Sequence, residues 1–552
     1  VSQVTQYYEK NIPDANSWLE VTEDALTTVS SVLTDMIQQC TKGASEKLTS
    51  TDRQSILDAL TAYRDEVYST GNADYAGRSV FTGYRTESTL MFTEAVTKKY
   101  SITEQINSNV IDSVKYVNSD FLNGLNESNY MTGTYIDENN TTKNYVDSVE
   151  QLISETDIYR IRLSYDNLND NDPVINLFNS ASGKYDLPVD VETIGKNDKP
   201  NPYYSMAQLD KANETAAPGA TTDKAIFIPE TGELLLTKSL YEKMAGLQDN
   251  VTTPTIDESQ IQITYNKSIW KNGDLKPEHY FASTDMSDAD PNNWIDYNQS
   301  YLDGIVEKQA IEYDVGINQT IRVNTTADEV FTHAIGRDVD DLIAALNGIA
   351  EIEATVNKLK SIKDGLDSSD ADYENKMTTL TNQIDAANKA YTFLNEKCQD
   401  LFESSITKMQ GHLNKANEAT TACGTRESKL SLIQNRLMSQ KTNFETLESE
   451  NENVDIVSNI SNIEDIQSLR EERSKTIDEL LEELKKYDSD SVYIVGGDSV
   501  YKQMLPYCDI CHVTRVYHSY EADAYFPNLD ADSDWKVVWE SDEETYYDLI
   551  YS

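Results

Sequence analysis

The chain has 552 residues, which is too long for one compact core, so we expect about two to four domains. It carries 95 acidic and 46 basic side chains, and the resulting net charge of −49 repels both nucleic-acid phosphates and anionic membrane surfaces. We therefore expect no nucleic-acid partner and no membrane partner, and no run of apolar residues is long enough to span a bilayer.

Two helices are predicted near the N-terminus. In the first, apolar residues from Leu19 to Cys40 follow the three-and-four spacing of an amphipathic helix. The second is expected to begin after an N-cap at Thr51 or Ser50, because short hydroxyl side chains accept hydrogen bonds from the first turn. It is expected to end at Gly71.

The next part of the chain, from residue 105 to about 335, loses this periodicity and becomes rich in Gly, Pro, Asn and Asp. Runs of β-branched and aromatic residues predict strands at 158–163, 225–228 and 261–265. We interpret this part as a β-rich domain with some helix. It has no glycine-rich phosphate loop, no histidine cluster and no distinctive acid/base pair, so no catalytic residue is predicted.

From about residue 336 the helical pattern returns. Its clearest part is a set of residues that alternate at spacings of four and three: Tyr373, Met377, Leu380, Ile384, Ala387, Tyr391, Leu394, Cys398 and Leu401. This spacing predicts a helix that packs along a partner for its whole length. At about 1.5 Å per residue, roughly 75 residues would make a helix about 110 Å long. The N-terminal pair is too short to bury its apolar stripe alone, so we expect it to pack antiparallel to the long helix, with the β-rich domain at the far end.

The five cysteines do not indicate a disulfide framework in a chain of this length. Cys40, Cys398 and Cys423 lie singly in helical patterns and are interpreted as small buried hydrophobes. Cys508 and Cys511 form a single CxxC, and a zinc site would need two more ligands at suitable spacing. His512 and His518 are nearby, but the local pattern is typical of a strand. We expect no metal site.

Three segments resemble the hook–filament junction protein of bacterial flagella, the hook-associated protein 3 type, which is a relative of flagellin. They are the opening stretches 6–12 and 15–19, the stretch 72–83, and the stretch 311–316 leading into 322–325 and Phe331. The resemblance covers about residues 1–455. It implies a mainly α fold, in which a flagellin-like antiparallel rod of long helices carries an inserted β-rich outer domain.

The resemblance places a structural corner after the second helix. The corner residues are Asn72, Gly77, Arg78, Phe81 and Gly83. Glycine permits positive φ at such a corner, and we expect Arg78 to pair with an acid across the rod. We interpret these residues as corner geometry rather than as a binding site.

By this resemblance the chain is a structural subunit and not an enzyme. The implied partners are the preceding hook-associated protein, flagellin and further copies of the chain, and the implied location is outside the cell, on the flagellum. Family members have further helical segments at both termini that line the filament core and carry the export signal, and an export chaperone would bind there. The N-terminal segment is not found in this sequence, which begins at Val1, and the C-terminal one is missing or replaced. We therefore expect that the N-terminal end of this sequence has been trimmed.

The last 75 or so residues carry a second resemblance, to the C-terminal half of bacterial dihydrofolate reductase. It rests on the stretches 492–501, 512–515 and 523–527, where an apolar strand is expected to run into Gly-Gly and then a helix. By resemblance, the residues that would line the NADP and pterin site are Gly496, Gly497, Ser499, Tyr501 and Thr514. The first half of that enzyme is not found in residues 1–470, so we expect no bound cofactor and no reductase activity from this α/β partial segment.

The predicted organisation has five parts. They are the N-terminal helical part at 1–104, the β-rich domain at 105–305, the second helical part at 306–455, a linker at 456–474 and the reductase-like segment at 475–552. Three alternatives stay open: flagellin itself, an unrelated coiled-coil surface adhesin, and a fusion with dihydrofolate reductase-type activity that uses NADPH. The choice between junction protein and flagellin rests on the opening stretch.

Overall fold

A computed structural model describes residues 7–45, 48–136, 142–144, 149–217, 219–247, 260–305, 309–452, 477–494, 497–515, 525–540, 544–546 and 549–551. The chain divides into two compact units, Val1–Glu445 and Thr446–Ser552, which are described separately. Within the described residues, no helix combines the length and apolar character that crossing a membrane requires.

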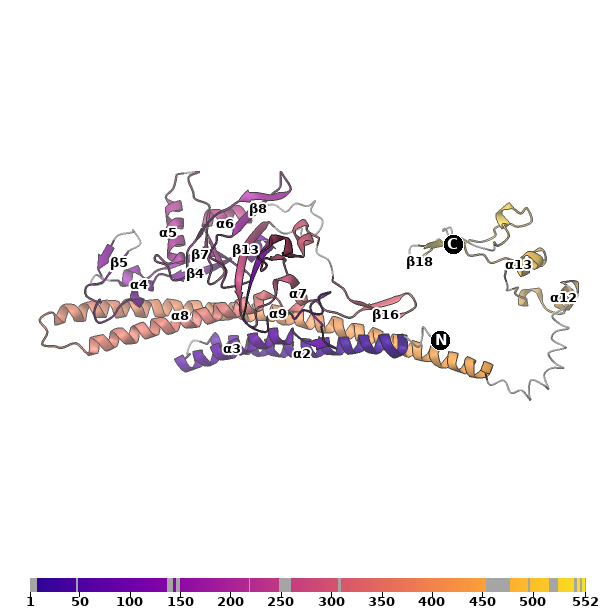
Figure 1. The fold of residues 1–552 in the computed structure, drawn as a ribbon, viewed down its shortest axis with the longest axis horizontal. Helices are drawn as coiled ribbons and strands as arrows, with labels where there is room; N and C mark the ends of the chain where they lie inside the picture. Colours follow the sequence, from indigo (N-terminus) through magenta and orange to yellow (C-terminus); the bar gives the residue numbers. More distant parts are fainter. Residues whose placement is uncertain are drawn as a thin grey trace. The chain divides into compact units, whose positions relative to one another are not determined.

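Four long helices organise the first unit (Figure 1). They are α2 (Ile12–Gly43), α3 (Ser50–Thr70), α8 (His333–Asp364) and α9 (Tyr373–Glu452), and they confirm the helices predicted from apolar spacing. The N-cap of α3 was predicted wrongly. Thr49, and not Thr51 or Ser50, caps the helix, because Thr49 and Asp52 form a capping box in which each side chain accepts from the other's backbone N–H.

Helices α2 and α9 run in opposite directions along each other. The Sγ of Cys423 lies 3.4 Å from the carbonyl oxygen of Leu19, and Gly43 lies against the ring of Phe402. As the residue number rises along α2, the number of its neighbour on α9 therefore falls. One apolar cluster contains the buried faces of both helices, including Leu19, Leu26, Leu33, Met36, Phe402, Met409, Cys423 and Leu430.

Helix α3 is likewise antiparallel to α8. Arg64, in the second half of α3, bonds to Asp340 near the start of α8 at 3.0 Å. Arg53, near the start of α3, forms an ion pair with Glu353, which lies further along α8. Helix α9 follows α8 after a short turn at residues 365–372, so its first part packs on α8 and its later part packs on α2. Helix α9 is therefore one continuous packing partner for both α8 and α2.

The chain between α3 and α8 forms two sheets that share an apolar core. One sheet has the strand order β10 (Asp190–Thr193), β11 (Lys224–Ile228), β12 (Glu233–Leu236), β7 (Glu155–Arg162) and β4 (Asp112–Val117). The other has the order β15 (Ile295–Tyr297), β14 (Ala282–Asp285), β3 (Val96–Ile106), β13 (Ile261–Trp270), β8 (Val174–Asn179) and β9 (Lys184–Pro188). The three predicted strands correspond to β7, β11 and β13, while β3 begins at Val96, ahead of the predicted start at residue 105.

Strand β11 shows why a short apolar run becomes a strand here. Ala225 and Phe227 face the core shared by the two sheets, whereas Ile226 and Ile228 face a second cluster that includes Met206 of α5 (Pro202–Glu214). Both faces of the strand are therefore buried, which favours consecutive apolar residues over alternation.

Smaller elements complete the first unit. They are the two-stranded pairs β1 (Asp74–Tyr75) with β2 (Arg78–Ser79), β5 (Thr134–Ile136) with β6 (Thr142–Asn144), and β16 (Glu312–Gly316) with β17 (Gln319–Arg322), and the helices α4 (Asp120–Asn123), α6 (Lys238–Ala245) and α7 (Ala327–Val330).

The β-rich domain was predicted to lie at the far end of the helices, and this prediction is wrong. Val117 and Leu122 share an apolar cluster with Val356 of α8 and Leu380 of α9, so the domain lies beside these helices (Figure 1). The physical reason is that the apolar stripe of α8 continues past Ile349, and its later residues, Ile352, Val356, Leu359 and Ile362, pack in one cluster with this domain and α9.

The described part of the second unit contains α12 (Ile477–Leu484), α13 (Asp498–Met504), β18 (Glu544–Tyr546) and β19 (Leu549–Tyr551). The predicted strand before Gly496 is wrong for its described part, because residues 492–494 are irregular backbone and pair with none of the described strands. The CxxC is not in a strand either: Cys508 follows a 3₁₀ turn and Cys511 lies in irregular backbone.

Candidate functional site

The corner after α3 depends on three residues with positive φ. Ala76, Gly77 and Gly83 have φ values of 51°, 77° and 60°. A side chain at Gly83 would collide with Gln309, whose Oε1 accepts a hydrogen bond of 3.1 Å from the backbone N–H of Tyr84. The glycine therefore lets the chain that leaves the helices pass close to the chain that returns to them.

Asn72 and Arg78 fasten this corner in different ways. The Oδ1 of Asn72 accepts a hydrogen bond of 3.1 Å from the backbone N–H of Met91. The guanidinium of Arg78 lies over the ring of Trp18 on α2, 5.2 Å from the ring centroid, and 3.5 Å from the hydroxyl of Tyr313. The expected acidic partner of Arg78 is therefore replaced by an aromatic one, since a planar guanidinium stacks well on an indole.

The outgoing and returning segments meet through two buried rings. Phe81 and Phe331 are fully buried. Further along the return, the side chain of Asn324 accepts from the N–H of Ile311 at 2.8 Å and donates to the carbonyl of Gln309 at 2.7 Å. The carbonyl of Asn324 in turn accepts from Arg426 of α9 at 3.0 Å. The stretches 72–83 and 311–325, which carry the resemblance to the junction-protein family, thus form one connected joint against α2 and α9.

A buried ion network joins the five-stranded sheet to α8. Arg160 of β7, whose side chain is only 5% exposed, bonds to Asp112 at 2.7 Å, Glu233 at 2.6 Å and Asp341 at 2.9 Å. Arg162 bonds to the same Asp341 at 2.7 Å. Burial acts to raise the pKa of Asp341, but Arg160 and Arg162 hold it below its usual value.

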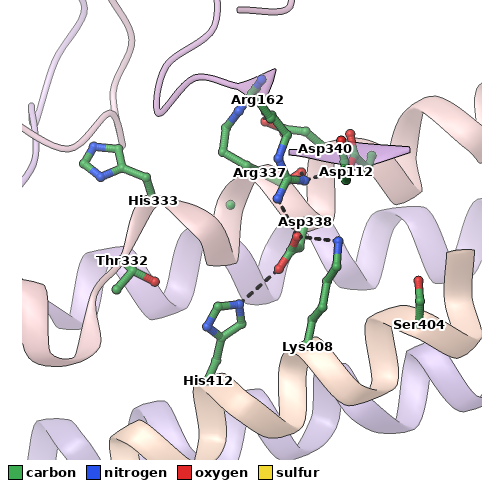
Figure 2. Close-up of polar contacts among 12 residues, drawn as sticks. Asp112, Arg162, Thr332, His333, Arg337, Asp338, Asp340, Ser404, Lys408 and His412 are labelled. Atoms are coloured by element: carbon green, nitrogen blue, oxygen red, sulfur yellow. Dashed lines mark hydrogen bonds and ion pairs between the residues drawn. The ribbon is translucent and has the colours of Figure 1, made fainter. Parts of the chain in front are cut away.

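The network continues across α8 to α9, as Figure 2 shows. Asp338 accepts from Arg162 at 2.6 Å, from Lys408 at 3.3 Å and lies 3.1 Å from Nε2 of His412. Burial acts to raise the pKa of this carboxyl, but the bond to His412 and the charges of Arg162 and Lys408 hold it far below its usual value. Beside it, Arg337 donates to the carbonyl of Leu163 at 3.0 Å.

This network was not predicted from the sequence. Asp and Glu are too common in the chain to single out Asp338 or Asp341. The available signal was the presence of two arginines, Arg160 and Arg162, inside an otherwise apolar predicted strand, because a buried arginine requires an acidic partner. Since each carboxylate here already has its cations, the network is suited to holding the sheets against the helices rather than to binding a ligand.

The described residues contain no group of three or more His, Cys, Asp or Glu side chains placed to hold a metal ion. A shallow hollow of about 390 Å³ lies between α2 and residues 69–73. It is lined by small side chains such as Ala25, Thr28 and Ala73, with Asp24 beside them.

The described reductase-like residues lie around helix α13 and in the exposed segment that contains Thr514. Gly496 lies outside the described residues, and Gly497 precedes α13 with ordinary extended backbone. The hydroxyl of Ser499 bonds to Gln503, the ring of Tyr501 packs edge to face on Phe526 at 5.3 Å, and Thr514 is exposed. Helix α13 has only seven residues, which is too short to make a strong anion site at its N-terminus.

Comparison with known proteins finds the dihydrofolate reductase family at residues 433–551. The dihydrofolate reductase of Staphylococcus haemolyticus is 35% identical over 68 residues, which is 12% of this chain and 40% of that protein. That of Bacillus subtilis is 33% identical over 63 residues, or 11% of this chain and 37% of that protein. The chain therefore spans about two fifths of the length of these relatives.

Solved structures similar to most of the chain are flagellar junction proteins. The crystal structure of FlgL from Xanthomonas campestris is 10% identical, covers 81% of this chain and 98% of its own, and has a TM-score of 0.25. That of flagellar hook-associated protein 3 from Legionella pneumophila is 9% identical, covers 79% and 97% respectively, and has a TM-score of 0.19. At these identities and TM-scores, the fold must be argued from the geometry above.

Proposed function

We propose that residues 1–455 form a structural subunit of the bacterial flagellum, at the junction between hook and filament. One observation carries the proposal. Helices α2 and α9 pair antiparallel, and the chain leaves and re-enters this flagellin-like helical rod at a single joint, where Phe81 meets Phe331. The residues that build this joint are those by which the sequence resembles the junction-protein family.

This architecture suits assembly because it separates two tasks. The helices offer long faces to neighbouring subunits, while the sheets form a domain beside them. Leu432 and Met438 of α9 are 71% and 54% exposed, so they could pack against a neighbouring helix. The subunit would act mechanically, without catalysis, outside the cell.

The partners follow from the same proposal. They are the preceding hook-associated protein, flagellin and further copies of this chain, which would pack side by side along their helices. An export chaperone would bind helical segments at the termini.

We further propose that the reductase-like segment has no reductase activity by itself. Among the described side chains between residues 477 and 540, Met504 is the one hydrophobic side chain that is buried, whereas Tyr493 and Trp539 are each 78% exposed. A nucleotide site needs a packed sheet behind it, and little apolar surface is covered here. The purified chain should neither bind NADPH in a fluorescence titration nor oxidise it in the presence of dihydrofolate. Oxidation at the rate of a complete reductase would favour the fusion alternative.

The location can be tested by electron microscopy. Antibodies raised against residues 7–445 would be applied with gold label to flagella isolated from the source cells. Label confined to the boundary between hook and filament is expected. Label along the whole filament would favour the flagellin alternative, and label on the cell surface away from flagella would favour the adhesin alternative, so either result would overturn the junction assignment.

A further inference from the structure

Lys267 of β13 has a buried ammonium group between two carboxyl groups. Its side chain has no exposed surface, and its Nζ lies 3.5 Å from Oδ2 of Asp274 and 3.7 Å from Oδ1 of Asp166. The same Nζ donates to the backbone carbonyl of Asp166 at 2.5 Å. Three oxygen atoms thus hold one amine at a defined place in the core of the sheets.

Aromatic rings form the wall of this site. The Nζ of Lys267 lies 5.2 Å from the centroid of Trp270, which itself packs on Phe92 at 4.8 Å and on Tyr165 at 5.3 Å. The side chain has no exposed surface, and this loss of hydration disfavours the charged form of the amine. Burial accordingly lowers the pKa of Lys267, even though two acidic residues act in the opposite direction. The lowered pKa makes the loss of a proton from this amine easier.

The pKa values of the two neighbouring carboxyl groups shift in opposite directions. Burial raises the pKa of Asp274, which favours its protonated form. Burial also acts to raise the pKa of Asp166, but Lys267 and Lys271 lower it below its usual value, so this group stays a carboxylate. Two neighbouring acids with pKa values pushed apart can serve as a neutral acid and a base in one reaction.

We propose that Lys267 and Asp274 react with each other to form an intramolecular amide bond, with Asp166 as the base. A proton first passes from the ammonium group of Lys267 to the carboxylate of Asp274. The neutral Nζ then attacks Cγ of the protonated carboxyl group, and a C–N bond forms. Asp166 accepts a proton from the nitrogen and passes it to the departing hydroxyl, so that the C–O bond breaks and one water molecule leaves. No oxidant, metal or further reactant is required.

The backbone around Asp274 keeps the two groups in position. The N–H of Lys271 donates to Oδ2 of Asp274 at 3.0 Å, and the N–H of Asp274 donates back to the carbonyl of Lys271 at 3.2 Å. Gly273, with φ at 97°, lets the chain turn between them. These bonds hold the carboxyl group of Asp274 beside the amine, with its Oδ2 3.5 Å from Nζ of Lys267, and fixed proximity of this kind lowers the barrier to a reaction between the two groups.

Mass spectrometry of the purified full chain tests the proposal directly. The intact mass is expected to fall short of the sequence mass by one water molecule. Trypsin does not cleave between Lys276 and Pro277, so it should then yield a branched peptide in which residues 272–308 are joined to the peptide that contains Lys267. An intact mass equal to the sequence mass would overturn the proposal. A branch to Asp166 would overturn the roles given to the two acids.

Two variants separate this reaction from others that lose water. Lys267→Arg keeps the positive charge but has no reactive amine, so its mass should equal its own sequence mass. Lys271→Arg alters the neighbouring cation, whose side chain is 56% exposed, and should keep the deficit of one water. A cyclic imide formed by an aspartate would also lose water, but that loss would persist in Lys267→Arg, and this result would overturn the proposal.

Discussion

Phe81 and Phe331 lie 250 residues apart in the chain and meet edge to face, with ring centroids 4.7 Å apart and an angle of 67° between the rings. One ring belongs to the segment that leaves the helices and the other to the segment that returns. Their contact closes the joint between the helices and the sheets, and it provides the first prediction.

Truncating either ring should destabilise the first unit strongly. Phe81→Ala is expected to lower the free energy of unfolding by about 3–5 kcal/mol, because it removes a fully buried ring and leaves a cavity. Urea denaturation followed by tryptophan fluorescence measures the loss. Tyr84→Ala is the matched control, since Tyr84 is 61% exposed and lies directly after the last corner residue, Gly83. If Phe81→Ala lowers the free energy of unfolding no more than Tyr84→Ala does, then the Phe81 ring does not hold the joint together.

The close approach of α2 and α9 can be tested at Gly43. A Cβ added there would lie 2.4 Å from the ring of Phe402, which is fully buried and has no free space to move into. Gly43→Ala should therefore destabilise the protein by about 1–3 kcal/mol. Gly411→Ala on α9 meets no atom within 4 Å and should be neutral or stabilising by up to about 1 kcal/mol, as alanine favours helix. Equal effects in a thermal unfolding experiment would contradict this packing.

The ion network predicts a large cost when its central cation is lost. Arg160→Met leaves Asp112, Glu233 and Asp341 facing one another without that charge, and we expect a loss of about 3–5 kcal/mol in the free energy of unfolding. In the same sheet, Lys224 pairs with Glu192, whose side chain is 50% exposed. Lys224→Met should cost about 0–1 kcal/mol because water screens such a pair. Chemical denaturation of both variants provides the comparison.

Two buried histidines predict a dependence of stability on pH. Burial lowers the pKa of His279 and of His333 to about 3 in the folded chain, against about 6.5 when unfolded. Their contribution is complete above pH 6.5. It is lost as the pH falls from 6.5 towards 3, because only the unfolded chain then takes up protons, at about 1.4 kcal/mol per pH unit for each histidine.

The urea midpoint should therefore fall between pH 7 and pH 4, a window that lies above the acid range in which Asp338 titrates. In the variant His333→Phe the slope should be shallower, since Tyr165, Tyr280 and Phe281 already form an aromatic surrounding for that ring. An unchanged slope in this variant would show that His333 is not buried as a neutral ring.

The long helices could be predicted because their periodic apolar residues reflect local geometry, which needs no knowledge of the partner. Strand β11 could be predicted from its short apolar run, which is bounded by turn residues. The position of the sheets could not be predicted in this way. It depends on pairs such as Arg160 and Asp341, which are 181 residues apart and carry no local signature.

The candidate site was predictable only in part. The corner glycines could be recognised because a positive φ angle is a local property that favours glycine, and both Gly77 and Gly83 have a positive φ. The partner of Arg78 was predicted wrongly, because which group stacks on a guanidinium is decided by the packing of α2 at Trp18. The strand before Gly496 failed for a related reason: a strand sequence forms a strand only where a neighbouring strand is available.

The hydrogen bond between Tyr84 and Gln309 places the two ends of the inserted segment next to each other. An insertion with adjacent ends is modular, because another domain with similarly spaced termini can replace it while the helices keep their register. Such an exchange must still supply cations for Asp338 and Asp341, or neutral residues in their place, since these carboxylates would otherwise lose their arginine partners. Within that condition, the inserted domain could diversify while the long helices stay the same.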